Sequence, residues 1–158
     1  MRYAGMKSGV NGWLLVLILG MVVMWPLMSL GALLSSLSGF EQVYAKTEYA
    51  MWVQSKTVMW MLSIVSISLS VGGGWRLYRV HSRESVDLAV YTMWIAWPLL
   101  SLFMVIAAVM ILKNPRAGNA YSPAIYHLVF AVLGAIAGTM YLKRSRRVQN
   151  TYRLPVYV

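Results

Sequence analysis

Few side chains in this sequence are able to do acid–base or metal chemistry. The 158 residues include four acidic side chains, two histidines and no cysteine. The acidic residues all fall in connections between long apolar runs, at Glu41, Glu48, Glu84 and Asp87. Ion-coupled transporters usually carry an ionisable group within the membrane, so this placement argues against a proton-coupled exporter. The lack of cysteine excludes disulfides and iron–sulfur clusters.

The two histidines, His81 and His127, do not predict a metal site. We expect them on opposite sides of the membrane, and neither has the His-Glu-x-x-His spacing of a zinc site. A single histidine near a helix end is most often only a polar residue there. The serines form no Gly-x-Ser-x-Gly motif. We therefore expect no enzyme activity, no catalytic residue, no metal and no cofactor.

The most informative residues belong to a short sequence that occurs twice. Residues 25–30 read Trp-Pro-Leu-Met-Ser-Leu, and residues 97–102, 72 positions later, read Trp-Pro-Leu-Leu-Ser-Leu. A proline inside a helix removes one hydrogen bond and frees the carbonyl four residues earlier, here that of Val22 or Trp94. Lipid does not solvate a free carbonyl, so protein or trapped water must bind it. Ser29 and Ser101 lie one turn onward and are candidates for that role.

Two roles fit the repeated sequence. We hypothesise that Pro26 and Pro98 kink symmetry-related helices and face each other near the axis of the protein. The kinks then either serve static packing or create a functional crevice, for which the candidate residues are Trp25, Pro26, Ser29, Trp97, Pro98 and Ser101. Core packing is the favoured role for the deeper tryptophans.

Four membrane-spanning helices are needed to position these residues. Hydrophobic residues make up 59% of the chain and charged residues only 11%, whereas soluble domains carry about a quarter charged residues. The apolar residues fall in four runs, which predict spans over 13–34, 58–78, 88–112 and 124–142. The predicted fold is a single all-α membrane domain over 1–158, a four-helix bundle. Its four transmembrane helices would form two tandem parallel helical hairpins related by an internal repeat.

Residues 35–57 are the longest connection between predicted spans. Apolar residues at helical spacing, including Phe40, are consistent with a short helix in the membrane interface, with Trp52 as its anchor. The period is weak, and an irregular loop with a few aromatic residues fits equally well. The sequence leaves both interpretations open.

Small residues within the spans predict close helix packing. Ser63, Ser66 and Ser70 follow one face of the second span, and Gly134 and Gly138 form a Gly-x-x-x-Gly pattern in the fourth. That pattern marks a tight crossing either inside the protein or between subunits. A homo-oligomer and a different membrane-protein partner therefore both stay open.

The net charge of +10 is distributed unevenly along the chain. If there are four spans, ten lysines and arginines lie on the side of both termini and four lie on the other. The positive-inside rule then places both termini in the cytoplasm. The cluster that follows the last span is expected to act as a topological stop signal and to bind anionic lipid headgroups; it comprises Lys143, Arg144, Arg146 and Arg147. No nucleic-acid partner is expected.

Three segments carry a resemblance to a known family. They are Gly-Trp-Leu-Leu at 12–15, Pro26-Leu27, and the tail over 141–152, which reads Tyr-Leu-Lys-x-Ser-x-Arg-Val-x-x-Thr-Tyr. Through them nearly the whole chain resembles the small bacterial inner-membrane proteins called domain of unknown function 2569. The resemblance implies a four-span bacterial membrane protein. The family has no established reaction, so it implies no catalytic or ligand-binding residues.

The function expected from the sequence is that of a non-enzymatic inner-membrane protein, an accessory or interaction subunit that acts through helix packing. The alternative is a small transporter or channel-like protein for a neutral or lipidic substrate. In that case the kinked first and third spans would form the pathway.

Overall fold

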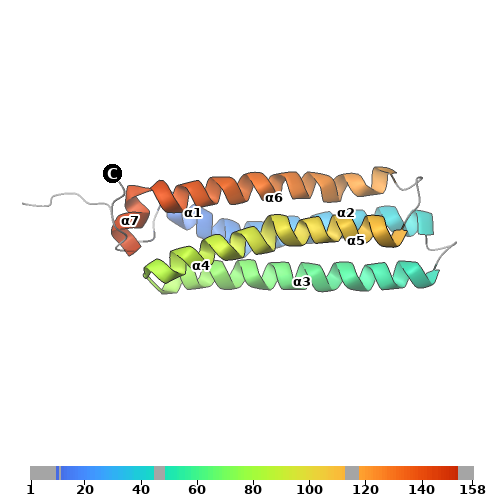
Figure 1. Cartoon of the computed structure of the whole chain (residues 1–158), viewed down its shortest axis with the longest axis horizontal. Helices are drawn as coiled ribbons and strands as arrows, with labels where there is room; N and C mark the ends of the chain where they lie inside the picture. The colour runs from blue at the N-terminus through green and yellow to red at the C-terminus, as the bar shows by residue number, and fades with distance from the viewer. Residues whose placement is uncertain (1–9, 11, 45–48, 113–117, 153–158) are drawn as a thin grey trace, which may run out of the picture.

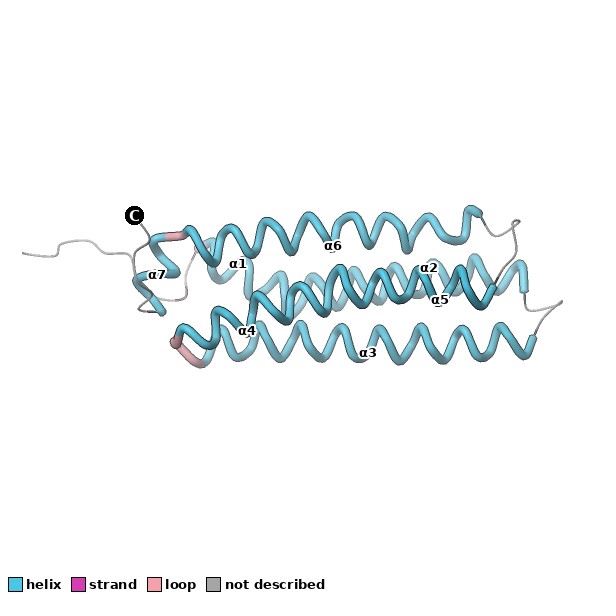
Figure 2. Tube along the Cα trace, viewed as in Figure 1, coloured by secondary structure: helices cyan, strands magenta, loops and turns pink. Residues whose placement is uncertain are grey.

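Four long helices dominate the structure. The computed structural model describes residues 10, 12–44, 49–112 and 118–152, and every element within these residues is helical. The four helices lie side by side (Figures 1 and 2), and each is long and apolar enough to cross a membrane. The chain is thus an all-helical protein with four candidate membrane spans, as the sequence predicts.

Two of the four spans are interrupted by a π-helical turn. The first comprises α1 (Trp13–Leu19), the π-helix η1 (Gly20–Met24) and α2 (Trp25–Tyr44). The second is the unbroken α3 (Tyr49–Arg79). The third comprises α4 (Arg83–Trp94), the π-helix η2 (Ile95–Leu99) and α5 (Leu100–Leu112). The fourth is α6 (Gly118–Arg144), which is followed by the short α7 (Arg146–Tyr152).

Each span packs against the spans before and after it in the chain. Helix α3 contacts α2, α4 and α5, and α6 contacts the same three helices. The first and third spans are therefore each flanked by the second and the fourth. This arrangement allows the two interrupted helices to face each other across the interior.

Residues 35–44 and 49–57 belong to the long helices themselves. Helix α2 continues to Tyr44 and α3 already begins at Tyr49. Phe40 and Trp52 are buried, with ring centroids 6.4 Å apart. Since α2 and α3 continue into this region, its described residues form neither a separate interfacial helix nor an irregular loop, and the two aromatic side chains pack against each other. The 31 residues of α3 extend about 46 Å, which exceeds the roughly 30 Å of hydrocarbon in a bilayer.

The turn between the second and third spans is short and capped. Ser82 precedes α4, and its side chain accepts a hydrogen bond from the backbone N–H of Ser85. Such a cap satisfies one of the free amides at a helix start. Glu84 in the first turn of α4 favours the same end through the helix dipole.

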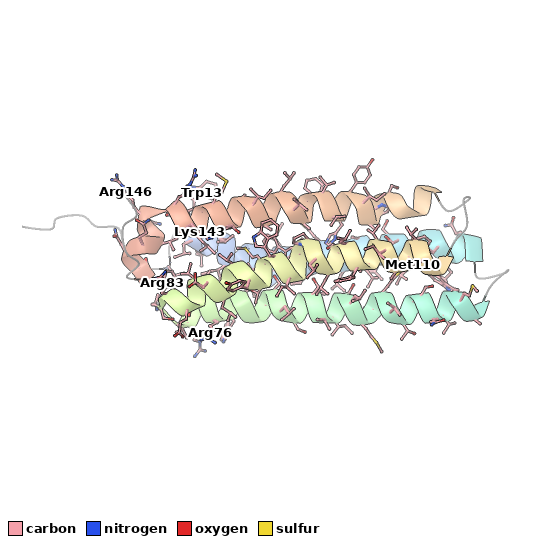
Figure 3. All side chains as sticks on the ribbon, viewed as in Figure 1. Trp13, Arg76, Arg83, Met110, Lys143 and Arg146 are labelled. Carbon is pink, nitrogen blue, oxygen red and sulfur yellow. The ribbon has the colours of Figure 1, made fainter. Side chains whose placement is uncertain are left out.

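Seven of the eight described lysines and arginines gather at one end of the helices, and the eighth, Lys56, lies near the start of α3. Arg76, Arg83, Lys143 and Arg146 lie at this end in Figure 3, and Met110 lies toward the opposite end. This basic end is made by the C-terminal part of α3, the start of α4, the C-terminal part of α6, and α7.

Helix α7 folds back against the basic end. The hydroxyl of Tyr152 donates a hydrogen bond to the carbonyl of Leu77, and its ring lies 5.6 Å from that of His81. Val148 and Tyr152 are both fully enclosed. At Gly12 the backbone φ is 63°, and a Cβ there would collide with the side chain of Arg147. Two of the segments that carry the family resemblance, residues 12–15 and 141–152, thus lie together at this end.

Candidate functional site at the paired tryptophans

Each copy of the repeated sequence lies at a π-helical turn. Five-residue spacing of the backbone hydrogen bonds leaves one carbonyl without its usual amide partner when the helix returns to four-residue spacing. The amide of Trp25 bonds to the carbonyl of Gly20, so it does not reach Met21. In the same way the amide of Leu100 bonds to Ile95 and Trp97, so it does not reach Ala96.

Two serines of α3 bind the carbonyls that these turns leave free. The hydroxyl of Ser70 donates to the carbonyl of Met21 at 2.8 Å, and that of Ser66 donates to the carbonyl of Ala96. The sequence correctly predicts that protein groups must satisfy freed carbonyls. The residues differ from those expected, because the π-helical turns shift the freed carbonyls and because the donors come from the neighbouring span.

The same two serines accept hydrogen bonds from the repeated tryptophans in a crossed pattern. Trp25 of the first span donates its Nε1–H to Ser66 at 3.2 Å, while Ser66 binds a carbonyl of the third span. Trp97 of the third span donates to Ser70 at 3.0 Å, while Ser70 binds a carbonyl of the first. Each serine therefore ties the first, second and third spans together.

The two indole rings are stacked on each other in the interior. Their centroids are 4.8 Å apart and their planes differ by 18°. Trp25 is 4% exposed and Trp97 is 6% exposed, which places both in the core, in agreement with the role that the sequence favours. We call these two residues the tryptophan pair.

The prolines themselves do not make the central contact. Pro98 is buried within η2, whereas Pro26 follows η1 and is only partly buried. The side chains that face each other across the interior are Trp25 and Trp97. The two π-helices also differ in their placement, since η2 contains its proline and η1 ends two residues before its own.

His127 of α6 joins the two serines of the repeated sequence. Its Nε2 lies 3.3 Å from the hydroxyl of Ser29, and its Nδ1 lies 3.2 Å from the hydroxyl of Ser101. The ring is 4.6 Å from that of Trp25, and the residue is buried. The expectation that His127 is only a polar residue at a helix end is wrong, because the residue is buried and bonded through both ring nitrogens. The missed signal was its place within a predicted span, where a polar side chain needs partners.

A small cavity of about 30 Å³ adjoins this cluster. All four spans contribute to its wall, which includes Ser29, Ser36, Met59, Ser101, Met104, Ala108 and His127. The hydroxyl of Ser36 is buried and has no hydrogen-bond partner among the described residues. Of the six residues predicted to line a crevice, the cavity includes Ser29 and Ser101, while the tryptophans and prolines lie outside its wall.

The remaining small residues of the predicted packing set lie inside the protein. Ser63 contacts the sulfur of Met104 at 3.9 Å. A Cβ added to Gly134 would approach the ring of Trp97 to 2.9 Å, and one added to Gly138 would approach the sulfur of Met93 to the same distance. Both glycines thus permit α6 to lie close to the third span. A bulky residue at Gly138 would disturb this internal contact with Met93.

The basic cluster at the end of α6 is displayed on the surface. Lys143, Arg144 and Arg146 are exposed, and Arg147 is partly buried beside Gly12. With Arg76, Arg79 and Arg83, the cluster brings seven cations to one end of the described helices.

The chain belongs to the DUF2569 family. A family model described as "Protein of unknown function (DUF2569)" matches residues 7–153. Comparison with curated proteins and with solved structures gives no match. The match extends from the segment before α1 to the end of α7, so it includes the tryptophan pair, His127 and the tail.

Proposed function

We propose that this member of the DUF2569 family is a non-enzymatic protein of the bacterial inner membrane, an accessory or interaction subunit that acts through helix packing. The observation that carries the proposal is an outward-facing pair of small residues on α3. Ser68 and Gly72 are four residues apart and both exposed, and a Cβ on Gly72 would meet nothing within 4 Å. Small residues at this spacing let another membrane helix approach closely.

The outward pair differs from the inward small residues of the same helix. Ser66 and Ser70 are occupied by the tryptophan pair, and an added Cβ on Gly73 would collide with Thr92. Large apolar side chains that are exposed along α3, including Met61 and Trp75, extend the outward face. A partner helix would thus find a narrow small-residue contact between larger flanking groups.

The orientation that we propose has both termini in the cytoplasm. The seven described cations at the basic end, together with the distribution over the whole sequence, support it through the positive-inside rule. The same cations would bind anionic lipid headgroups, each contributing about 1 kcal/mol near the surface. An alkaline phosphatase fused after residue 158 should be inactive, and activity of that fusion in the periplasm would overturn the orientation.

We further infer that the chain consists of two tandem parallel helical hairpins, built as an internal repeat. The inference is supported by the matched residues 25–30 and 97–102, each beside a π-helical turn, and by the stacking of their tryptophans.

The interaction role is tested with two matched glycine variants. Gly72→Ile blocks the outward face of α3, while Gly31→Ile makes the same change at another exposed helical glycine with open space around it. A photo-crosslinking residue in place of Met61 should capture one defined protein in membranes, either a foreign subunit or a second copy. Gly72→Ile should abolish this product and Gly31→Ile should preserve it. Equal yields from both variants, at equal protein levels, would contradict the proposal.

A transporter for a neutral or lipidic substrate is the second candidate, and the cavity beside His127 favours it. The stacked tryptophan pair and the core toward the basic end close the interior beyond His127 in this conformation. Transport would require this pair to separate. Flux of a neutral solute into proteoliposomes, abolished by a substitution in the pair while the protein stays folded, would favour transport over the interaction role.

A further inference from the structure

The cavity beside His127 has unused hydrogen-bonding capacity. Ser36 lies 95% buried in the cavity wall, and its hydroxyl has no partner among the described residues. A buried polar group without a partner costs about 1–3 kcal/mol, so native proteins usually satisfy it with protein, water or a ligand. Ser36 therefore points to an occupant of the cavity.

The cluster of Ser29, His127 and Ser101 leaves a second donor free. A neutral imidazole has one N–H and one acceptor nitrogen. One serine consequently accepts from the ring, while the other donates to it. The serine that accepts retains its own hydroxyl proton, and both Ser29 and Ser101 belong to the cavity wall. Together with Ser36, the wall offers two O–H donors, along with serine lone pairs that accept.

The size and shape of the cavity limit what fits. A cavity of about 10–15 Å³ holds one water molecule. The volume of about 30 Å³ therefore accommodates two groups of that size. The end of a primary alcohol, a methylene with its hydroxyl, has this size and both donates and accepts hydrogen bonds. The remaining wall is apolar, with Leu33, Met59 and Met104, and the cavity is partly open to the outside. An alkyl chain therefore has both a compatible lining and an exit.

From these features we infer that the cavity is a binding site for the terminal hydroxyl of a membrane-soluble primary alcohol, held by Ser36 and by the cluster of Ser29, His127 and Ser101. The inference goes beyond the interaction role, since it concerns the interior and not the outer face of α3. An aromatic ring such as that of a quinone is too large for the enclosed volume. Bound water is the competing occupant, and the experiment below distinguishes the two.

The test uses the full chain in detergent micelles with ¹⁵N-labelled histidine. Only two imidazoles are present, and exposed His81 serves as the internal control for His127. Titration with n-decanol should shift the ring nitrogen signals of His127 with saturation, because the alcohol reorients the serine hydroxyls bonded to them. The signals of His81 should stay in place. n-Decane, which has the same chain without the oxygen, should produce no saturable shift.

Substitution of Ser36 identifies the polar contact. Ser36→Ala should weaken decanol binding about fivefold, which corresponds to the loss of one neutral hydrogen bond. Ser38→Ala is the matched control on α2, since its exposed hydroxyl bonds to the carbonyl of Ser35. Unsaturable shifts with decanol, equal effects of decane, or equal affinity in Ser36→Ala would each overturn the inference in favour of water alone. The comparison of decanol with decane on the unmodified chain decides the matter even if the variants do not fold.

Discussion

Ser70→Ala provides a direct test of the crossed hydrogen bonds around the tryptophan pair. The substitution leaves two buried groups without a partner, the carbonyl of Met21 and the indole N–H of Trp97. Hydrogen bonds between membrane helices are worth about 0.6 kcal/mol on average and up to about 1.7 kcal/mol. The loss of two such bonds should lower the free energy of unfolding by about 1–3 kcal/mol. The measurement is unfolding by sodium dodecyl sulfate in mixed micelles, followed by circular dichroism.

A double-mutant cycle separates the specific bond from a general loss of packing. In the Trp97→Phe background the indole N–H is absent, so Ser70→Ala should cost less, by about 0.6–1.7 kcal/mol. Ser66 makes no bond to Trp97, so Ser66→Ala should cost nearly the same in either background, within about 0.5 kcal/mol. The reciprocal cycle with Trp25→Phe should couple to Ser66 instead. Equal coupling of both serines to Trp97, or a neutral Ser70→Ala, would refute the crossed arrangement.

Two further changes test the packing of α6 and of the tail. Gly134→Ala should destabilise the fold by about 1–3 kcal/mol, because the rigid ring of Trp97 blocks the added methyl group. Gly138→Ala should be nearly neutral, because its methyl group meets the flexible end of a methionine. Denaturant unfolding of the two variants measures the difference. Burial, with a smaller effect of a neighbouring tyrosine, raises the pKa of Tyr152 from 10.0 to about 12. The stabilisation by its hydrogen bond to Leu77 is therefore complete below pH 10 and is lost as the pH rises toward 12. Unfolding scans at pH 9 and pH 12 test this. Tyr152→Phe should be less stable than the unmodified chain at pH 9 and equally stable at pH 12.

Much of the fold follows from the sequence because lipid restricts the available structures. A long apolar run in a bilayer must be helical, since every backbone group needs an internal partner. The four runs therefore predict four helices, and these are present. The ends of the helices are harder to predict, because a helix can continue beyond its apolar run through segments whose apolar period is weak. Residues 35–44 and 49–57 illustrate this, since their aromatic residues stabilise an extension of α2 and α3.

The candidate site was only partly predictable for a different reason. The sequence identifies Trp25, Trp97 and the need for groups that bind freed carbonyls. It does not reveal which turn becomes π-helical. In the first span the amide of Trp25 reaches Gly20, which leaves the carbonyl of Met21 to Ser70. The partners lie 49 residues away in the chain, at Ser70, and their identity depends on how the helices pack.

The hydrogen bonds of His127 could not be predicted from the sequence either. A single histidine has no spacing pattern of its own, and its two partners are 98 and 26 residues away. Only the packing of the first, third and fourth spans brings Ser29 and Ser101 to the two ring nitrogens. The repeat of the serines in the sequence was visible, but nothing local indicated that one residue would bind both.

The second and fourth spans complement the repeated sequence in different ways. Both indole N–H groups bond to serines of α3, and both repeated serines bond to the histidine of α6. When the two helices are aligned on Leu77 and Leu142, each fully buried, Ser66 and Ser70 correspond to Ala131 and Ala135.

These alanines are also completely buried, but they have no side-chain donor for a freed carbonyl. In this alignment His127 corresponds to Leu62 of α3. The first and third spans thus keep a matched sequence, while the second supplies hydroxyls to the tryptophan pair and the fourth supplies an imidazole to the cavity. Such a division accounts for the polar lining of the cavity beside His127, which combines the repeated serines with the imidazole of the fourth span.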